Sequence, residues 1–142
     1  MSISDLIRDP SAKWHRESPA SPDAIRDLVE QASIELPNDY LTFLRHSNGG
    51  EGKLGMDPYW FQIWRAEEVV QFGTGYQVPE HVPGCFAFGS SGGGDLLAFD
   101  TRGPSPWPVV TIPCIGMALD TVRQIAGDFA EFVQNLRRKC DI

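Results

Sequence analysis

At residues 86–100 the chain reads FAFGSSGGGDLLAFD, in which two apolar runs flank a glycine-rich centre. Four of the six residues from Gly89 to Gly94 are glycine, which adopts backbone angles that other residues avoid. Apolar runs on either side of such a turn are typical of a β-hairpin. The same glycines beside Ser91 and Asp95 could also form a phosphate-binding loop or a nucleophile elbow. This stretch therefore decides whether the chain has the features of an enzyme.

Further strand patterns lie on both sides of the hairpin. Its two predicted strands cover residues 85–88 and 95–99, and residues 109–112 form another apolar run. Residues 59–65 are rich in aromatic and β-branched side chains, which favour strands. The pattern over residues 117–126 is ambiguous. Strands joined by short turns predict an antiparallel sheet.

The strand predicted at residues 59–65 would carry two tryptophans on one face. Because side chains alternate along a strand, one face holds Tyr59, Phe61 and Ile63, and the other holds Trp60, Gln62 and Trp64. The tryptophan face is either covered by a helix, the commoner case, or exposed for recognition. After this strand we expect a short helix over residues 66–72 and a loop over residues 73–84.

Two helices are predicted before the strands. Ser21 and Pro22 are typical of a helix start, and the helix should end near Ser33. A second helix begins at Leu36-Pro37 and stops at Asn48-Gly49-Gly50, residues that tolerate left-handed backbone angles. The inward face of the first helix has the spacing i, i+3, i+4, i+7 and comprises Ile25, Leu28, Val29 and Ala32.

A last helix closes the chain. Asp128 is a good N-cap, and Glu131 three residues later completes a capping box. Its inward face comprises Phe129, Phe132, Val133 and Leu136, and its C-terminal end carries the basic residues Arg137, Arg138 and Lys139. Residues 1–20 are an irregular or partly helical lead-in whose Trp14 packs on the domain. The order predicts one α+β domain over residues 1–142, with a central antiparallel sheet flanked by N-terminal helices and a C-terminal helix.

Composition narrows the classes of partner. The formal net charge is −7 and the isoelectric point is near 4.8, so nucleic acid, which needs a basic footprint, is an unfavourable ligand. A basic protein partner is favoured, although acidity alone also serves solubility. No apolar run is long enough to span a membrane, and the N-terminus lacks signal-peptide features. Three widely spaced cysteines indicate reduced thiols and a cytoplasmic protein.

The sequence lacks the features that a serine hydrolase needs beside its nucleophile. Residues 89–93 match G-x-S-x-G with Ser91 central, but that motif needs a following helix and a later histidine. A strand pattern follows instead, and all three histidines, His15, His46 and His81, precede the serine. A small hydrolase using Ser91 therefore remains only as a remote alternative.

The other catalytic and cofactor motifs are equally incomplete. No lysine follows Gly94, as a phosphate loop requires, and no second ligand pair stands near His81 and Cys85 to complete a metal site. Asp95 and Asp100 have an odd separation, so they point to opposite faces of a strand, and Asp95 is expected to cap the turn. We therefore predict no catalytic, cofactor-binding or metal-binding residues, and a binding protein instead.

Three segments together resemble the SUKH superfamily, in its Smi/Knr branch. They are LPNDYLTFL with NGGEG at residues 36–52, the hairpin stretch at 88–100, and the region from Pro108 to Phe132. The resemblance runs from about residue 20 to residue 138. Its signature residues are Pro37, Tyr40, Phe43, Leu44, Asn48, Gly49, Gly50, Gly89, Gly93, Gly94, Asp95 and Asp100.

The resemblance implies an α+β fold without enzymatic activity. Bacterial members are inferred to be immunity proteins that neutralise a cognate polymorphic toxin, often a nuclease or deaminase, whereas fungal members regulate cell-wall synthesis. We expect the compact bacterial form, with a basic toxin domain as partner and neither nucleic acid nor membrane bound. A regulatory or scaffold protein is the alternative. Acidic and aromatic residues suited to a basic partner are Glu51, Asp57, Tyr59, Trp60, Trp64, Glu67, Glu68 and Trp107, although the tryptophans could equally belong to the core.

Overall fold

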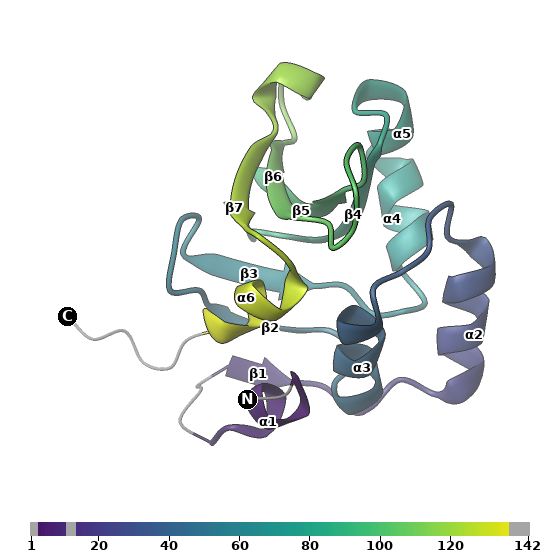
Figure 1. Cartoon of the computed structure of the whole chain (residues 1–142), viewed down its shortest axis with the longest axis vertical. Coiled ribbons are helices and arrows are strands. Elements are labelled where there is room, and N and C mark those ends of the chain that lie inside the picture. Colours follow the sequence, from purple (N-terminus) through teal and green to yellow (C-terminus); the bar gives the residue numbers. More distant parts are fainter. Residues whose placement is uncertain (1–2, 11–13, 137–142) are drawn as a thin grey trace.

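A seven-stranded antiparallel sheet forms the centre of the protein (Figure 1). The structure, a computed structural model, describes residues 3–10 and 14–136. Every strand pairs with its sequence neighbours, so the order across the sheet is the order along the chain. The strands are β1 (Trp14–Arg16), β2 (Gly50–Lys53), β3 (Trp60–Ile63), β4 (Cys85–Ser90), β5 (Asp95–Asp100), β6 (Val109–Pro113) and β7 (Arg123–Ala126).

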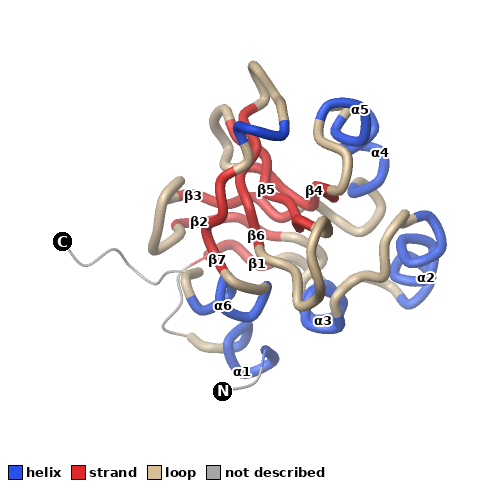
Figure 2. The backbone as a smooth tube through the Cα atoms, turned by 45° about the horizontal axis from the view of Figure 1, so that its top comes forward, coloured by secondary structure: helices blue, strands red, loops and turns tan. Residues whose placement is uncertain are grey.

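Helices surround this sheet and confirm the predicted α+β class (Figure 2). The N-terminal helices precede β2, two short helices connect β3 to β4, and one helix follows β7. They are α1 (Ile3–Arg8), α2 (Pro22–Gln31), α3 (Asn38–His46), α4 (Val69–Gly75), α5 (Val78–His81) and α6 (Phe129–Gln134), with a 3-10 turn, η1, at Leu119–Thr121.

The central strands are covered on both faces, because all four residues from Leu96 to Phe99 in β5 are buried. On one face Tyr40 of α3 packs edge-on against Phe99 and against Phe129 of α6, with ring centroids 5.4 and 5.5 Å apart. Helices α4 and α5 pack against β4, and both views place them on the side of β4 away from α6. The predicted inward face of the last helix, including Phe129, is buried here.

The glycine-rich stretch is a hairpin, as predicted. β4 and β5 pair directly, and the amide of Ser91 donates to the carbonyl oxygen of Asp95 across the turn at 2.9 Å. The predicted cap by Asp95 is wrong: the Ser91 hydroxyl accepts the amides of Gly93 and Asp95 at 3.2 and 3.3 Å. A strand therefore follows Gly94, and the strand–serine–helix geometry of a nucleophile elbow is not formed here.

Two of the predicted helix starts are confirmed by their caps. The Ser21 hydroxyl accepts the Ala24 amide at 3.1 Å, and an Asp128 oxygen accepts the Glu131 amide at 2.8 Å. The Glu131 carboxylate accepts from Gly127 rather than from the cap residue. Val29, predicted to face inward, is 46% exposed because α2 contacts the domain through a narrower stripe. The predicted basic end of the last helix, residues 137–139, lies outside the described residues.

Several element boundaries differ from prediction. The lead-in contains helix α1 and strand β1, with Trp14 buried in the sheet as its ring was expected to be. The helix predicted at residues 66–72 begins at Val69, and the predicted loop after Gly73 is largely helical. Glycines and prolines at helix ends, which read as loop in sequence, explain the second difference. The ambiguous residues 117–126 contain η1 and β7.

No helix within the described part of the chain is long and apolar enough to cross a membrane.

Candidate functional site

The outward side of β2 and β3 carries the first group of predicted contacts. Glu51 lies opposite Gln62 in the strand register, and the Gln62 amide donates to the Glu51 carboxylate at 2.9 Å. Ser90 of β4 extends the row by donating to the Gln62 side-chain oxygen at 2.8 Å. Period two places Lys53 and Trp60 on the same side, because the intervening Gly52 and Phe61 are buried. We call Glu51, Lys53, Trp60, Gln62 and Ser90 the β2–β3 face.

Trp60 remains accessible on this face although it touches the hairpin. Its side chain is the neighbour that a Cβ at Gly92 would meet, at 2.9 Å from the ring atom Cδ1. Gly92 has φ of +76° and no side chain, so the turn can lie close to the pyrrole edge of the indole. The residue is still 38% exposed. An aromatic ring that contacts the hairpin on one edge and remains partly exposed is suited to anchoring a partner.

Carboxylates surround a small hollow beside the β2–β3 face. The hollow has a volume of about 170 Å³, and Glu17, Glu51, Glu68 and Arg65 contribute its charged lining. Three carboxylates against one guanidinium leave a formal charge of −2. The Arg65 guanidinium lies 4.0 Å from Glu17. The Glu51 carboxylate accepts only the Gln62 amide and the Glu68 carboxylate only the Arg65 backbone amide, at 3.3 Å, and no ion pair within the described residues neutralises either carboxylate.

Asn48 fixes the next carboxylate, Glu67, at the edge of the same region. Its side-chain amide donates to Glu67 at 2.8 Å, and its oxygen accepts the Ala66 amide at 2.7 Å. The hydrogen bond from Asn48 lowers the pKa of Glu67 below its ordinary value. The signature asparagine therefore organises the segment between β3 and α4 and keeps an exposed carboxylate ionised.

Trp64 is placed in the interior instead of on the recognition face. Trp64 is only 8% exposed, and it lies beyond the end of β3. The ring packs edge-on against Phe72 at 5.1 Å and stacks on Tyr76 at 6.2 Å. Tyr76 is 47% exposed, so it is the accessible aromatic residue of this pair. No pattern in the sequence pointed to Tyr76, because it lies in a predicted loop.

The β2–β3 connection holds two further predicted contacts. Tyr59 is 67% exposed and has φ of +67°, so it precedes the strand in which it was expected. Asp57 pairs with Arg123 of β7 at 2.8 Å, and this hydrogen bond lowers the pKa of the carboxyl group. Tyr59 is thus available for contact, whereas the charge of Asp57 already has a partner within the chain.

Trp107 belongs to a different surface. It lines a groove of about 420 Å³ between the start of α3 and the β5–β6 connection, with Glu35 and Asp39 on the rim. Its indole nitrogen donates to the Gly103 carbonyl oxygen at 3.2 Å. The structure therefore divides the predicted contacts between the β2–β3 region and this separate groove.

The helical signature residues serve packing. Four of them are buried or half-buried in or beside α3: Pro37, Tyr40, Phe43 and Leu44. The glycine pair after α3 has positive φ, +94° at Gly49 and +142° at Gly50, which confirms the expected left-handed backbone. Their backbone lies against β3 and against Trp14 of β1, so the sheet contacts leave no room for a Cβ.

The hairpin signature residues divide by role. A Cβ at Gly89 would collide with the Gln62 carbonyl oxygen, whereas one at Gly94 would meet nothing within 4 Å and one at Gly93 only an ordinary contact. Asp100 accepts Nε and Nη2 of Arg102 at 2.9 and 2.8 Å. These bonds lower the pKa of Asp100. The signature thus describes backbone geometry and a local ion pair.

Catalytic geometry is not assembled around Ser91. The residue is only 8% exposed, and its hydroxyl accepts the turn amides. Each histidine contacts a polar side chain elsewhere: Glu17 for His15, Ser4 for His46 and Gln77 for His81. Over residues 3–10 and 14–136, no group of three or more His, Cys, Asp or Glu side chains could hold a metal ion.

The fold defines a compact α+β domain. The sequence model of the SMI1 / KNR4 family (SUKH-1) matches residues 19–135. The chain therefore belongs to the SMI1 / KNR4 family, which is generally non-catalytic. It is also 32% identical over 69 residues to the uncharacterized protein YnaB of Bacillus subtilis (strain 168), a match that covers 49% of this chain and 44% of that protein. The match thus spans less than half the length of that relative.

Proposed function

We propose that the protein is a protein-binding module that neutralises a basic bacterial toxin domain, of the nuclease or deaminase type, in the cytoplasm. One observation carries the proposal: the carboxylates of Glu51 and Glu68, neither of which forms an ion pair with another described residue, share a hollow beside the partly exposed ring of Trp60. Aromatic anchors next to acidic side chains are suited to a partner rich in arginine and lysine.

Charge supports this direction of binding. The net charge of −7 favours encounter with a positively charged surface and disfavours nucleic acid. An acidic protein that covers the basic active-site region of a nuclease would exclude the nuclease's substrate, because both would bind the same positively charged surface. Family membership supports a non-catalytic role, and the buried, turn-capping Ser91 is consistent with it.

The contact surface is expected to contain the β2–β3 face together with Tyr59, Glu67 and Glu68. Trp60 and Tyr59 supply accessible aromatic surface, and the carboxylates supply charge. The Trp107 groove is a second contact region if the partner extends along α3. Asp57 contributes shape more than charge, because Arg123 already neutralises it.

The test begins with the gene neighbourhood. The C-terminal domain of a large secreted protein encoded immediately upstream is expressed in a bacterial host with and without this chain. We expect growth arrest by the domain alone, and both growth rescue and a co-purifying complex when the chain is present. Absence of both a complex and rescue would remove this function for that pair.

Charge reversal locates the interface. Glu51→Lys with Glu68→Lys should weaken the complex at least tenfold and abolish rescue, because both carboxylates face the hollow. Glu80→Lys on α5 makes the same type of charge change at an exposed position outside that hollow and should leave rescue intact. Unchanged affinity in the double variant would place the interface elsewhere.

A regulatory or scaffold protein is the competing interpretation. It predicts that no toxin gene is adjacent and that the chain binds a cell-envelope or signalling protein. The same charge-reversal pair then tests whether that partner uses the β2–β3 face.

A further inference from the structure

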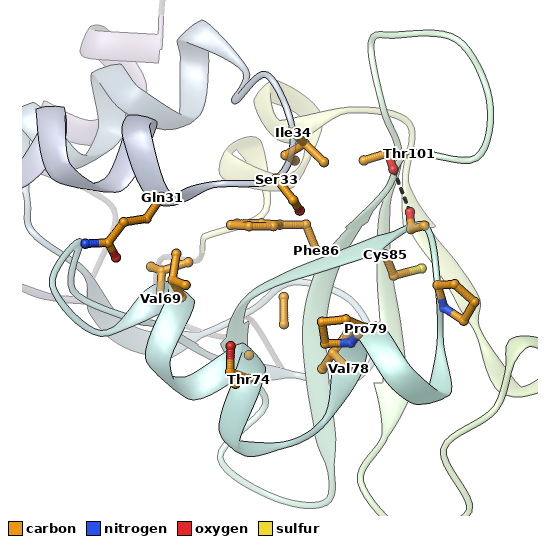
Figure 3. Close-up of a pocket in the computed structure, with 15 residues that line it drawn as sticks. Gln31, Ser33, Ile34, Val69, Thr74, Val78, Pro79, Cys85, Phe86 and Thr101 are labelled. Atoms are coloured by element: carbon orange, nitrogen blue, oxygen red, sulfur yellow. Dashed lines mark hydrogen bonds between the residues drawn. The ribbon is translucent and has the colours of Figure 1, made fainter.

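Another hollow lies between the α2–α3 connection, α4, α5 and β4 (Figure 3). Its volume is about 440 Å³, within the range of small-molecule sites. The floor is buried and apolar, formed by Val69, Val78, Cys85 and Ala87. Phe86 reaches across it toward Ser33 and Ile34. We call this the Phe86 pocket.

The lining of the Phe86 pocket carries no charged side chain. Its polar members are Gln31, Ser33, Thr74, Thr101 and Cys85, all neutral types at pH 7, and burial raises the pKa of the Cys85 thiol to about 11. This is unusual in a chain of which 22% is charged. An ionised ligand entering the pocket would lose its hydration and meet no opposite charge.

A cation beside the pocket, Arg102, is already paired. The side chain of Arg102 lies against Gly84 at the pocket edge, and its guanidinium makes two hydrogen bonds with the Asp100 carboxylate. A carboxylate or phosphate ligand would therefore compete with Asp100 for this group. The electrostatics of the pocket favour a neutral occupant.

Neutral hydrogen-bonding groups stand on the rim. Gln31, Ser33 and Thr74 are exposed, and none of their side chains makes a hydrogen bond with another described residue. Thr101 differs, because its hydroxyl donates to the Gly84 carbonyl oxygen at 2.7 Å. An apolar floor with a few free polar groups at the mouth is the usual construction of a site that orients a small ligand.

Gly73 keeps one wall of the pocket open. It lies within α4 and lines the hollow, and a Cβ built there would meet nothing within 4 Å. Its φ is outside the left-handed range, so the backbone does not require glycine. Alanine or leucine would favour the helix more, and the missing side chain leaves space that a ligand can fill.

We propose that the Phe86 pocket binds a small, uncharged, predominantly apolar molecule, with its polar end at the rim formed by Gln31, Ser33 and Thr74. The site is separate from the β2–β3 face and does not depend on the proposed toxin partner. The pocket discriminates by charge: it binds a neutral molecule more tightly than the ionised analogue of the same length.

The experiment compares neutral and ionised probes of matched size. Binding of 1-hexanol, hexanoate and hexylammonium to the full chain is followed by NMR titration at pH 7. We expect saturable shifts with 1-hexanol, at least tenfold weaker binding of both ions, and intermolecular NOEs from the alcohol to Phe86 and Val78. Equal binding of all three probes, or no saturable binding of the alcohol, would overturn the proposal.

Matched glycine substitutions locate the binding. Gly73→Leu places a side chain in the pocket and should weaken 1-hexanol binding at least tenfold. Gly75→Leu lies in the same helix, also meets no atom within 4 Å, and does not line the pocket, so binding should persist. Loss of binding in Gly75→Leu but not in Gly73→Leu would place the probe elsewhere.

The NOEs in the unmodified chain show where the alcohol binds without any variant. NOEs only to residues outside the pocket would contradict the proposal.

Discussion

The indole of Trp14 in β1 lies against the backbone of Gly50 in β2, so close that a Cβ there would come within 2.6 Å of the ring atom Cζ3. Gly50 also has φ of +142°. The same indole stacks on Phe43 of α3 with a centroid distance of 5.5 Å. The first strand of the sheet is therefore held by contact between an aromatic ring and a glycine backbone, and α3 closes the other side of the ring.

Replacing Gly50 with alanine should destabilise the protein by about 2–4 kcal/mol, through overpacking against Trp14 and a strained φ. The midpoint of urea unfolding measures this. Gly103→Ala, where a Cβ would meet nothing within 4 Å, should stay within about 0.5 kcal/mol of the parent.

A double-mutant cycle isolates the contribution of the Trp14 ring. In a Trp14→Leu background the cost of Gly50→Ala should shrink, because the ring that the Cβ meets is gone, while the costs of φ and of the close approach to the His15 carbonyl oxygen remain. An identical cost in both backgrounds would show that the contact with Trp14 contributes nothing.

The elements that could be predicted from sequence are those specified locally. The hairpin follows from its glycines between two apolar runs, and the helix starts at Ser21 and Asp128 follow from capping side chains. β1 could not be predicted, because a strand of three residues has no measurable period and its pairing with β2 joins segments far apart in the chain. The same applies to β7, whose residues become a strand by pairing with β6.

The candidate site was predictable by residue type but not by placement. Trp60 and Trp64 have the same alternation in sequence, yet β3 ends at Ile63, so Trp64 turns inward to Phe72 while Trp60 stays exposed. The pairing of Asp57 with Arg123 depends on curvature that brings the β2–β3 connection to β7. Such curvature is a property of the whole sheet and leaves no local signal.

The glycines of the hairpin should differ sharply in tolerance. Gly89→Ala should cost about 1–3 kcal/mol, because its Cβ would collide with the backbone oxygen of Gln62. Gly94→Ala should change stability by less than about 0.5 kcal/mol. Thermal unfolding of the two variants compares them directly, and equal losses would contradict the steric explanation.

The cap of α6 offers a conservative pair. Asp128→Ala removes the oxygen that accepts the Glu131 amide and should cost about 1 kcal/mol, whereas Asp128→Asn keeps an acceptor and should cost much less. Chemical denaturation of both variants measures the difference. If the asparagine variant lost as much as the alanine variant, charge at the helix start would matter more than the hydrogen bond.

The Asp57–Arg123 pair predicts a small pH dependence of stability. The folded-state pKa of Asp57 is lowered, so the unfolded chain takes up a proton first as the pH falls. The contribution is present above the unfolded pKa and is lost as the pH falls below about 4. Both side chains are about half exposed, so the effect should be small. It should diminish further in about 0.5 M salt, because the Debye length is short at that ionic strength. Urea midpoints between pH 3 and 7 test this in Asp57→Asn, alone and with Arg123→Gln; additive effects would show that the pair is not coupled.

The thiol of Cys85 should be nearly inert in the folded protein. Burial raises its pKa to about 11, the Asp100 carboxylate adds to this, and Arg102 opposes it. Because the thiolate is the reactive form, alkylation by iodoacetamide at pH 7.5 should be about two orders of magnitude slower than in urea. Mass spectrometry of a Cys140→Ser variant follows Cys85 and Cys114 separately. Asp100→Asn removes a carboxylate that raises the pKa and leaves Arg102 unpaired, so it should accelerate alkylation of Cys85. A rate in the folded parent equal to that in urea would show that the site does not shield the thiol.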